Sequence, residues 1–177
     1  MPNMDTIEQN LANWRASHVA SIPIAGLLSR NHIAYKWKGP FRCWLLREAA
    51  FWRVTDLLTQ SHTLHQQEHG LGARILLRSG FETLASLIYL NHNMRAVLAG
   101  DLDFHEFSHL TTRQVSGAKN EPRHPDAINI LTMIDKGEKK YPGLRGIYDS
   151  LSERDVVDGL YGRLAWRWPV VPHAECT

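Results

Sequence analysis

The stretch from Gly70 to Gly100 constrains the fold of this chain more than any other. It is rich in Leu, Ile, Ala and Met, contains no proline and is far longer than a β-strand. We therefore predict one long helix over Leu71–Ala99. Apolar side chains cover most of its circumference, which is typical of a helix at the centre of a bundle. They are Leu76, Leu77, Leu84, Leu87, Ile88 and Leu98.

One polar stripe interrupts this apolar surface. At about 100° per residue, Arg74, Arg78, Glu82, Ser86 and Tyr89 fall on the same side of the helix. Arg78 and Glu82 can pair within the helix, because residues four apart are neighbours on a helix surface. Charged side chains are rarely buried without a partner. We therefore expect either an ion-pair network that joins the stripe to the preceding long helix, or a functional polar groove. In the groove, Arg78 and Glu82 are the best catalytic candidates.

Apolar residues at helical spacing predict further helices, so the expected fold is an all-α bundle of about five to seven helices. The short connection around Gly70 makes the helices Phe41–His69 and Leu71–Ala99 a central antiparallel hairpin. We expect one domain over residues 1–153 and an irregular tail over residues 154–177, where prolines interrupt any helical pattern. The other predicted helices are Asp5–Pro23 with Asp5 as N-cap, Ile24–Tyr35, a helix from Asp101 or Asp103 to Ser116, Asp126–Gly137, and one that begins at Leu144.

The composition excludes several classes of function. Twenty Lys and Arg against eighteen Asp and Glu give a net charge of only +2, so no strong field indicates DNA or acidic lipid. Cys43 and Cys176 are too few for the disulfide framework of a small secreted protein. The uncharged run Thr83–Met94 is shorter than the roughly 20 residues that span a bilayer. We expect a cytoplasmic protein without a signal peptide or a membrane partner.

Two groups of histidines are candidate metal ligands. His105-Glu106-Phe-Ser-His109 has the H-E-x-x-H form of zinc peptidases, in which two histidines bind the metal and the glutamate activates water. Both histidines point away from the apolar side of their helix and no clear third ligand follows. We therefore favour a solvated helix face, with a zinc hydrolase as a distant alternative.

The second group is His62, His65 and His69, which are spaced three and four residues apart. They continue the apolar stripe of the first long helix. Such histidines can bind a metal or respond to pH, but at a helix end they more often form hydrogen bonds at the mouth of a bundle. We predict no metal and no cofactor.

Several blocks between Trp37 and Glu153 carry a family resemblance. They are Gly39-Pro-Phe-Arg-Cys-Trp-Leu-Leu-Arg-Glu-Ala, Arg78-Ser-Gly-Phe-Glu-Thr, Ala127-Ile-Asn-Ile-Leu-Thr-Met-Ile-Asp-Lys, Tyr141-Pro-Gly-Leu and Tyr148-Asp-Ser-Leu-Ser-Glu153. Together they resemble a family of bacterial helical proteins known only as a domain of unknown function. That family is itself similar to the HEPN helical bundles of toxin and phage-defence systems.

Some HEPN bundles are metal-independent ribonucleases that work as dimers, so the resemblance implies RNA cleavage by a His that moves a proton and an Arg that stabilises phosphate charge. Relatives are expected to carry His-Pro-Asn after Glu153, whereas Arg154-Asp-Val-Val157 follows here. We attribute this change to truncation, a frameshift or divergence. The HEPN signature is an Arg followed by a His five to seven residues later. Arg167 and His173 have this spacing, but a chain with this many Arg and His residues is expected to contain such a pair by chance. We therefore expect a non-catalytic, self-associating HEPN-like domain. The alternative is an active ribonuclease with RNA as its partner.

Overall fold

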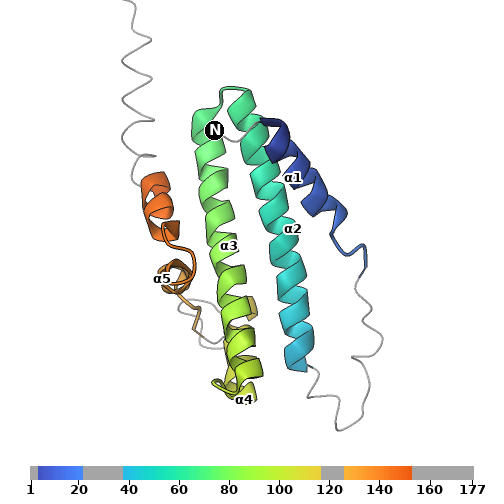
Figure 1. The fold of residues 1–177 in the computed structure, drawn as a ribbon, viewed down its shortest axis with the longest axis vertical. Coiled ribbons are helices and arrows are strands. Elements are labelled where there is room, and N and C mark those ends of the chain that lie inside the picture. Colours follow the sequence, from blue (N-terminus) through green and yellow to red (C-terminus); the bar gives the residue numbers. More distant parts are fainter. Residues whose placement is uncertain (1–3, 22–37, 117–125, 153–177) are drawn as a thin grey trace, which may run out of the picture.

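Two long antiparallel helices form the centre of the molecule (Figure 1). The computed structural model describes residues 4–21, 38–116 and 126–152. Helix α2 (Lys38–Gln66) has 29 residues and helix α3 (Gly70–Ala99) has 30. The predicted hairpin is therefore confirmed. Gly100 ends α3 with φ of 81°, a left-handed conformation that a residue without a Cβ adopts at little cost.

Small residues allow α2 and α3 to approach closely. A Cβ atom at Gly80 would lie 3.2 Å from Cδ2 of Leu58, which is tighter than an ordinary contact. Ser61, which is buried, donates a hydrogen bond from Oγ to the carbonyl oxygen of Ala73 at 2.7 Å. Because Ala73 is buried as well, this bond ties the upper parts of the two helices together inside the core.

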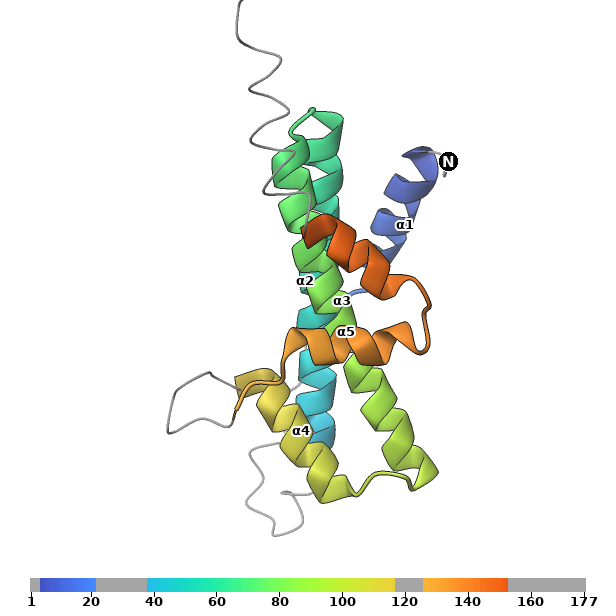
Figure 2. The same ribbon diagram turned by 90° about the vertical axis from the view of Figure 1, so that its left-hand side faces the viewer.

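The C-terminal part of the described chain covers one side of α3 (Figure 2). Helix α4 (Phe104–Ser116) packs against α2 and α3, and helix α5 (Ile130–Glu138) crosses α3. A last helix follows over residues 144–152. The main core cluster lies between α3 and these last two helices. It consists of Ala85, Tyr89, Met133, Ile134 and Tyr148. A second cluster joins α2, α3 and α4 through Cys43, Leu90 and Phe107.

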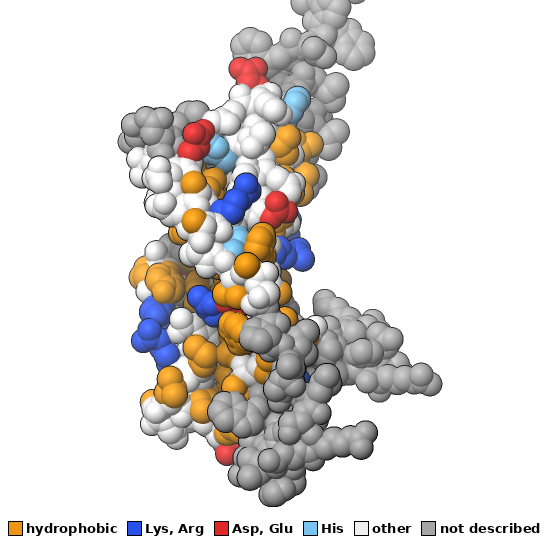
Figure 3. Space-filling view, turned by 90° about the vertical axis from the view of Figure 1, so that its right-hand side faces the viewer, with side chains coloured by type: hydrophobic (Ala, Val, Ile, Leu, Met, Phe, Trp, Pro, Cys, Tyr) orange, Lys and Arg blue, Asp and Glu red, His pale blue; other side chains and the backbone are white. Residues whose placement is uncertain are grey.

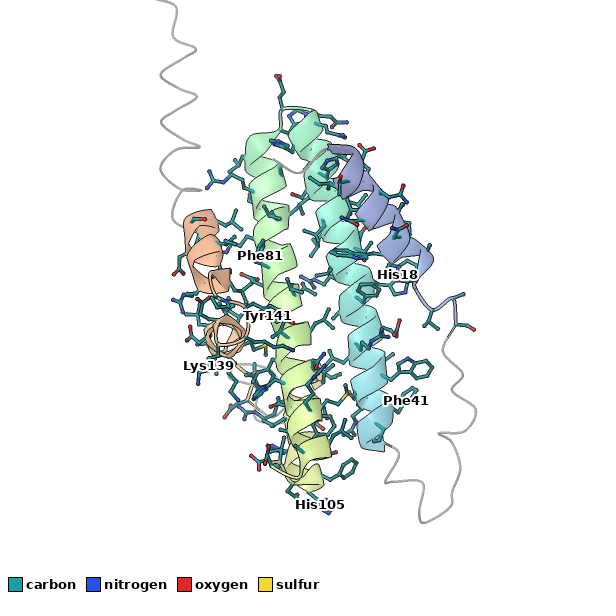
Figure 4. The ribbon with its side chains drawn as sticks, viewed as in Figure 1. His18, Phe41, Phe81, His105, Lys139 and Tyr141 are labelled. Carbon is teal, nitrogen blue, oxygen red and sulfur yellow. The ribbon has the colours of Figure 1, made fainter. Side chains whose placement is uncertain are left out.

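Helix α1 (Met4–Ala16) packs against α2, and His18, two residues beyond the end of α1, also contacts α2. His18 Nε2 lies 3.1 Å from Thr55 Oγ1, and the imidazole centroid lies 4.0 Å from the ring of Trp52. Figure 4 shows His18 between α1 and α2. The expectation that this helix runs to Pro23 is wrong, because the chain leaves the helix after Ala16 and His18 turns onto α2.

Three predicted helix starts meet different outcomes. Asp103 is the N-cap of α4, since its Oδ1 accepts hydrogen bonds from the backbone N–H groups of His105 and Glu106 at 2.8 and 3.3 Å. Asp126 does not begin α5; Asn129 does, with its side chain accepting from Leu131 N at 3.0 Å. Asp5 lies within α1 rather than before it.

The regular elements in the described part of the chain are helices, so the fold is an all-α bundle around a central helix hairpin. In these ranges no helix combines the length and the hydrophobicity needed to cross a membrane. The predicted helix over residues 24–35 and the predicted tail over residues 154–177 lie outside the described residues.

Candidate functional site

The charged part of the polar stripe on α3 contacts the last helix. Arg78 Nε lies 3.4 Å from Glu82 Oε1. The hydroxyl of Tyr148 donates to the same Glu82 oxygen at 3.0 Å and accepts from Arg78 Nη2 at 3.4 Å. The guanidinium also lies 5.5 Å from the centroid of the Tyr148 ring. The hydrogen bond with Tyr148, followed by the nearby charges, raises the pKa of Arg78.

The other residues of the stripe each meet a different partner. Arg74 Nη2 donates to Ser150 O, and Ser86 accepts from the side-chain amide of Gln114 on α4, both at 3.3 Å. Tyr89 is only 4% exposed and packs in the main core cluster. The ammonium of Lys136 on α5 lies 4.8 Å from its ring centroid.

The stripe therefore lies at the interface between α3 and the chain that follows it. This arrangement corrects the expected network, which placed the partners of the stripe on α2. Charged residues of α2 form contacts within α2 instead: Arg47 pairs with the neighbouring Glu48, and Asp56 accepts from Gln60 at 2.8 Å.

The H-E-x-x-H residues lie on the surface. His105, Glu106 and His109 are all exposed, and Figure 4 shows His105 at the foot of the molecule. The expectation of a solvated helix face is confirmed. Hydrogen bonds from the backbone of His105 and Glu106 lower the pKa of Asp103, so this carboxylate serves to cap the helix. Across the three described ranges, no three His, Cys, Asp or Glu side chains are grouped so that they could hold a metal ion.

The three histidines at the end of α2 do not form one group. His62 and His65 line a groove of 680 Å³ between α1, α2 and α3, which we call the upper groove. His69 lies in the turn before α3 and its side chain makes no capping hydrogen bond there. The upper groove is lined by Ile7, Asn10, Leu11, Trp14, Leu58, Ser61, His62, His65, Gly70, Ala73, Arg74 and Leu77.

A second groove, of 530 Å³, lies between α2, α3 and the start of α4, and we call it the lower groove. Figure 3 shows hydrophobic side chains gathered over the lower half of the molecule on the side of α2. Burial raises the pKa of the Cys43 thiol, whose sulfur lies 3.3 Å from that of Met94. The lower groove is lined by Pro40, Cys43, Trp44, Arg47, Phe51, Leu87, Leu90, Asn91, Met94, Val97, Leu98, Phe104 and Phe107.

Neither groove was predicted, although the sequence carries a signal for both. Apolar residues recur at seven-residue spacing on each long helix, as Trp44, Phe51 and Leu58 on α2 and as Leu77, Leu84 and Leu98 on α3, where Asn91 occupies the one polar position of the series. A seven-residue repeat is typical of helices that pack along a continuous seam. Part of this seam is used between α2 and α3, and part of it lines the grooves.

The arrangement offers apolar surfaces with few polar groups. The ion pair of Arg78 and Glu82 is bound to the buried Tyr148, and His62 and His65 line the upper groove instead. Such surfaces are suited to binding an apolar partner. No protein-family model, no curated protein and no solved structure matches this chain.

Proposed function

We propose that this chain is a non-catalytic, degenerate helical domain of the HEPN-like type, which self-associates in a bacterial toxin or phage-defence context. The observation that supports self-association is an exposed row on α3, formed by Leu84, Asn91 and Leu98. Leu84 is 38% exposed, Leu98 is 83% exposed, and Asn91 between them is exposed too. Leucines at such spacing favour burial against another helix.

The non-catalytic part of the proposal is supported by the surroundings of the best catalytic candidate. The described partners of Arg78 are Glu82 and Tyr148, and neither is a histidine. The histidine that the resemblance requires after Glu153 is missing from the sequence. A general acid–base mechanism needs a proton-transferring group within hydrogen-bond reach of the reacting atoms.

The row on α3 is complementary to itself. Asn91 lies midway between the two leucines, so an antiparallel pairing of two α3 helices about Asn91 places Leu84 against Leu98 of the partner subunit. A twofold interface requires this reciprocity, because residue i contacts j and j contacts i. One polar residue within an apolar seam fixes the register, since a shifted pairing leaves its amide facing a leucine.

The lower groove extends this surface. Asn91 and Leu98 belong both to the exposed row and to the lining of the groove, together with the aromatic rings of α2. A second copy therefore meets a hollow beside the row, into which its own side chains pack. Full burial of an exposed leucine contributes about 1.5–3 kcal/mol. Leu98, which is 83% exposed, therefore gains more from association than Leu84, which is 38% exposed.

Cysteine cross-linking tests the register. In a Cys43→Ala/Cys176→Ser background, we expect Asn91→Cys to form a disulfide with the same residue of a second copy. Leu84→Cys/Leu98→Cys also cross-links, whereas Leu98→Cys alone does not, because the partner's Leu84 lies opposite it. Cross-linking of Leu98→Cys alone with no cross-linking of Asn91→Cys would exclude this register.

Sedimentation tests the association itself. Leu98→Asp is expected to weaken the dimer at least tenfold, since it places a charge in the apolar contact with Leu84 of the partner subunit. Leu71→Asp is the matched control, because Leu71 is 46% exposed on α3 but lies off the row. A strict monomer at high concentration contradicts the proposal. Cleavage of RNA in EDTA that Arg78→Ala abolishes would contradict its non-catalytic part.

A further inference from the structure

The upper groove has an apolar floor. Leu58, Ala73 and Leu77 belong to the hairpin, and the side chains of α1 form the opposite wall, which includes Trp14. Its volume of 680 Å³ falls within the range of about 300–1,000 Å³ that small-molecule sites occupy. Helix α1 thus does not pack fully against α2 and α3, and the groove remains between the three helices.

The titratable side chains that line this groove are all basic. Arg74, His62 and His65 line it, and none of its described lining residues is acidic. Arg74 also donates from Nη2 to Ser150 O of the last helix at 3.3 Å. An imidazole donates a hydrogen bond when neutral and carries a positive charge when protonated, and both states favour a carboxylate.

The start of α3 lies at the same end of the groove. Gly70, its first residue, belongs to the lining, and no side chain caps this helix end. Backbone N–H groups and the helix dipole there add positive potential to that of the nearby side chains. The groove therefore combines an apolar length with an electropositive end.

We infer that the upper groove binds an amphiphile with one acyl chain and a carboxylate, which is the chemical class of a fatty acid. The chain lies along Leu58 and Leu77, and the carboxylate lies at His62, His65 and Arg74. From Leu58 to His65 the axis of α2 extends roughly 10 Å, which suits a medium-length chain. This inference is independent of the self-association proposed above, since the two surfaces share no lining residue.

Calorimetric titration of the full-length chain with sodium decanoate, below its micelle concentration, tests the inference. We expect saturable binding at one site, with an affinity that increases about fourfold for each methylene between hexanoate and decanoate. Decanol, which has the same chain without the charge, is expected to bind at least tenfold more weakly. Equal binding of decanol and decanoate, or no binding of either, would overturn the inference.

Two variants separate the head and chain contacts. His62→Gln/His65→Gln is expected to weaken decanoate binding about tenfold. His69→Gln, in the adjacent turn but outside the lining, is the matched control and leaves the affinity unchanged. Asn10→Trp adds a ring at the groove wall and lowers the affinity without altering the histidines. Equal affinities of all three variants would refute the site. So would binding to vesicles containing phosphatidylglycerol without binding of monomeric decanoate, because it would indicate a membrane surface instead.

Discussion

At the residue scale, the contact with Tyr148 gives the polar stripe a structural role. Its side chain is 5% exposed, while the Arg78 and Glu82 side chains that it joins are 41% and 36% exposed. An ion pair this exposed contributes at most about 1 kcal/mol by itself. The stabilising element is therefore the buried ring, and the charges satisfy its hydroxyl. The residues that looked most like a catalytic pair thus hold the last helix on α3.

Tyr148→Phe is expected to lower the free energy of unfolding by about 1 kcal/mol, because the hydroxyl donates one hydrogen bond and accepts another. Urea unfolding measures this difference. Tyr141→Phe is the matched control, since Tyr141 is 48% exposed and its substitution is expected to change the free energy by less than about 0.5 kcal/mol. Equal effects of the two substitutions would show that the network adds no stability.

At the element scale, Glu138 joins two helices. It is the last residue of α5, and its carboxylate accepts hydrogen bonds from the backbone N–H groups of Gly143 and Arg145 at 2.8 Å each. It therefore caps the start of the helix over residues 144–152. These two backbone hydrogen bonds lower the pKa of Glu138. The ionised carboxylate is thus favoured in the folded state.

This lowered pKa predicts a pH dependence. Because the pKa of Glu138 is lower in the folded than in the unfolded chain, its stabilising effect is complete above the ordinary glutamate pKa. The effect is lost as the pH falls through the lowered value. Glu138→Gln should therefore lower Tm at neutral pH, and the difference from the unsubstituted chain should shrink on acidification. Glu106→Gln, in an exposed position on α4, is the control; a gap that stays constant with pH would contradict the role of the charge.

The sequence predicted long elements better than their ends. Helices α2 and α3 follow from a pattern repeated over many residues, so an error at one position changes little. A helix start depends on one side chain that reaches the right N–H group. Asp103 and Asp126 are equally good caps in the sequence, but the chain uses Asn129 instead of Asp126. The polar stripe was predicted because it also follows from a helical pattern repeated over many residues. The contact of Tyr148 with this stripe was not predicted, because the residues in contact are far apart in the sequence.

For the whole molecule, the two sides of the hairpin have different roles. Residues 126–152 bury one side of α3, and the two grooves are lined by α1 to α4 instead. Ligand and partner binding should therefore depend on the grooves, and substitutions of exposed groove residues such as Leu98 are expected to change association with little effect on folding. Cys43, Leu90 and Phe107 also line the lower groove, but they belong to the second core cluster, so their substitution is expected to lower stability as well.

Ile134 and Leu131 test this division within one helix. Ile134 is 1% exposed in the main core cluster, whereas Leu131 is 38% exposed on the same helix, α5. Ile134→Ala leaves a cavity between α5 and α3 and is expected to lower the free energy of unfolding by about 2–5 kcal/mol. Leu131→Ala should cost less than about 1 kcal/mol. If urea unfolding gives equal losses in the free energy of unfolding for both variants, then the packing of α5 against α3 does not stabilise the fold.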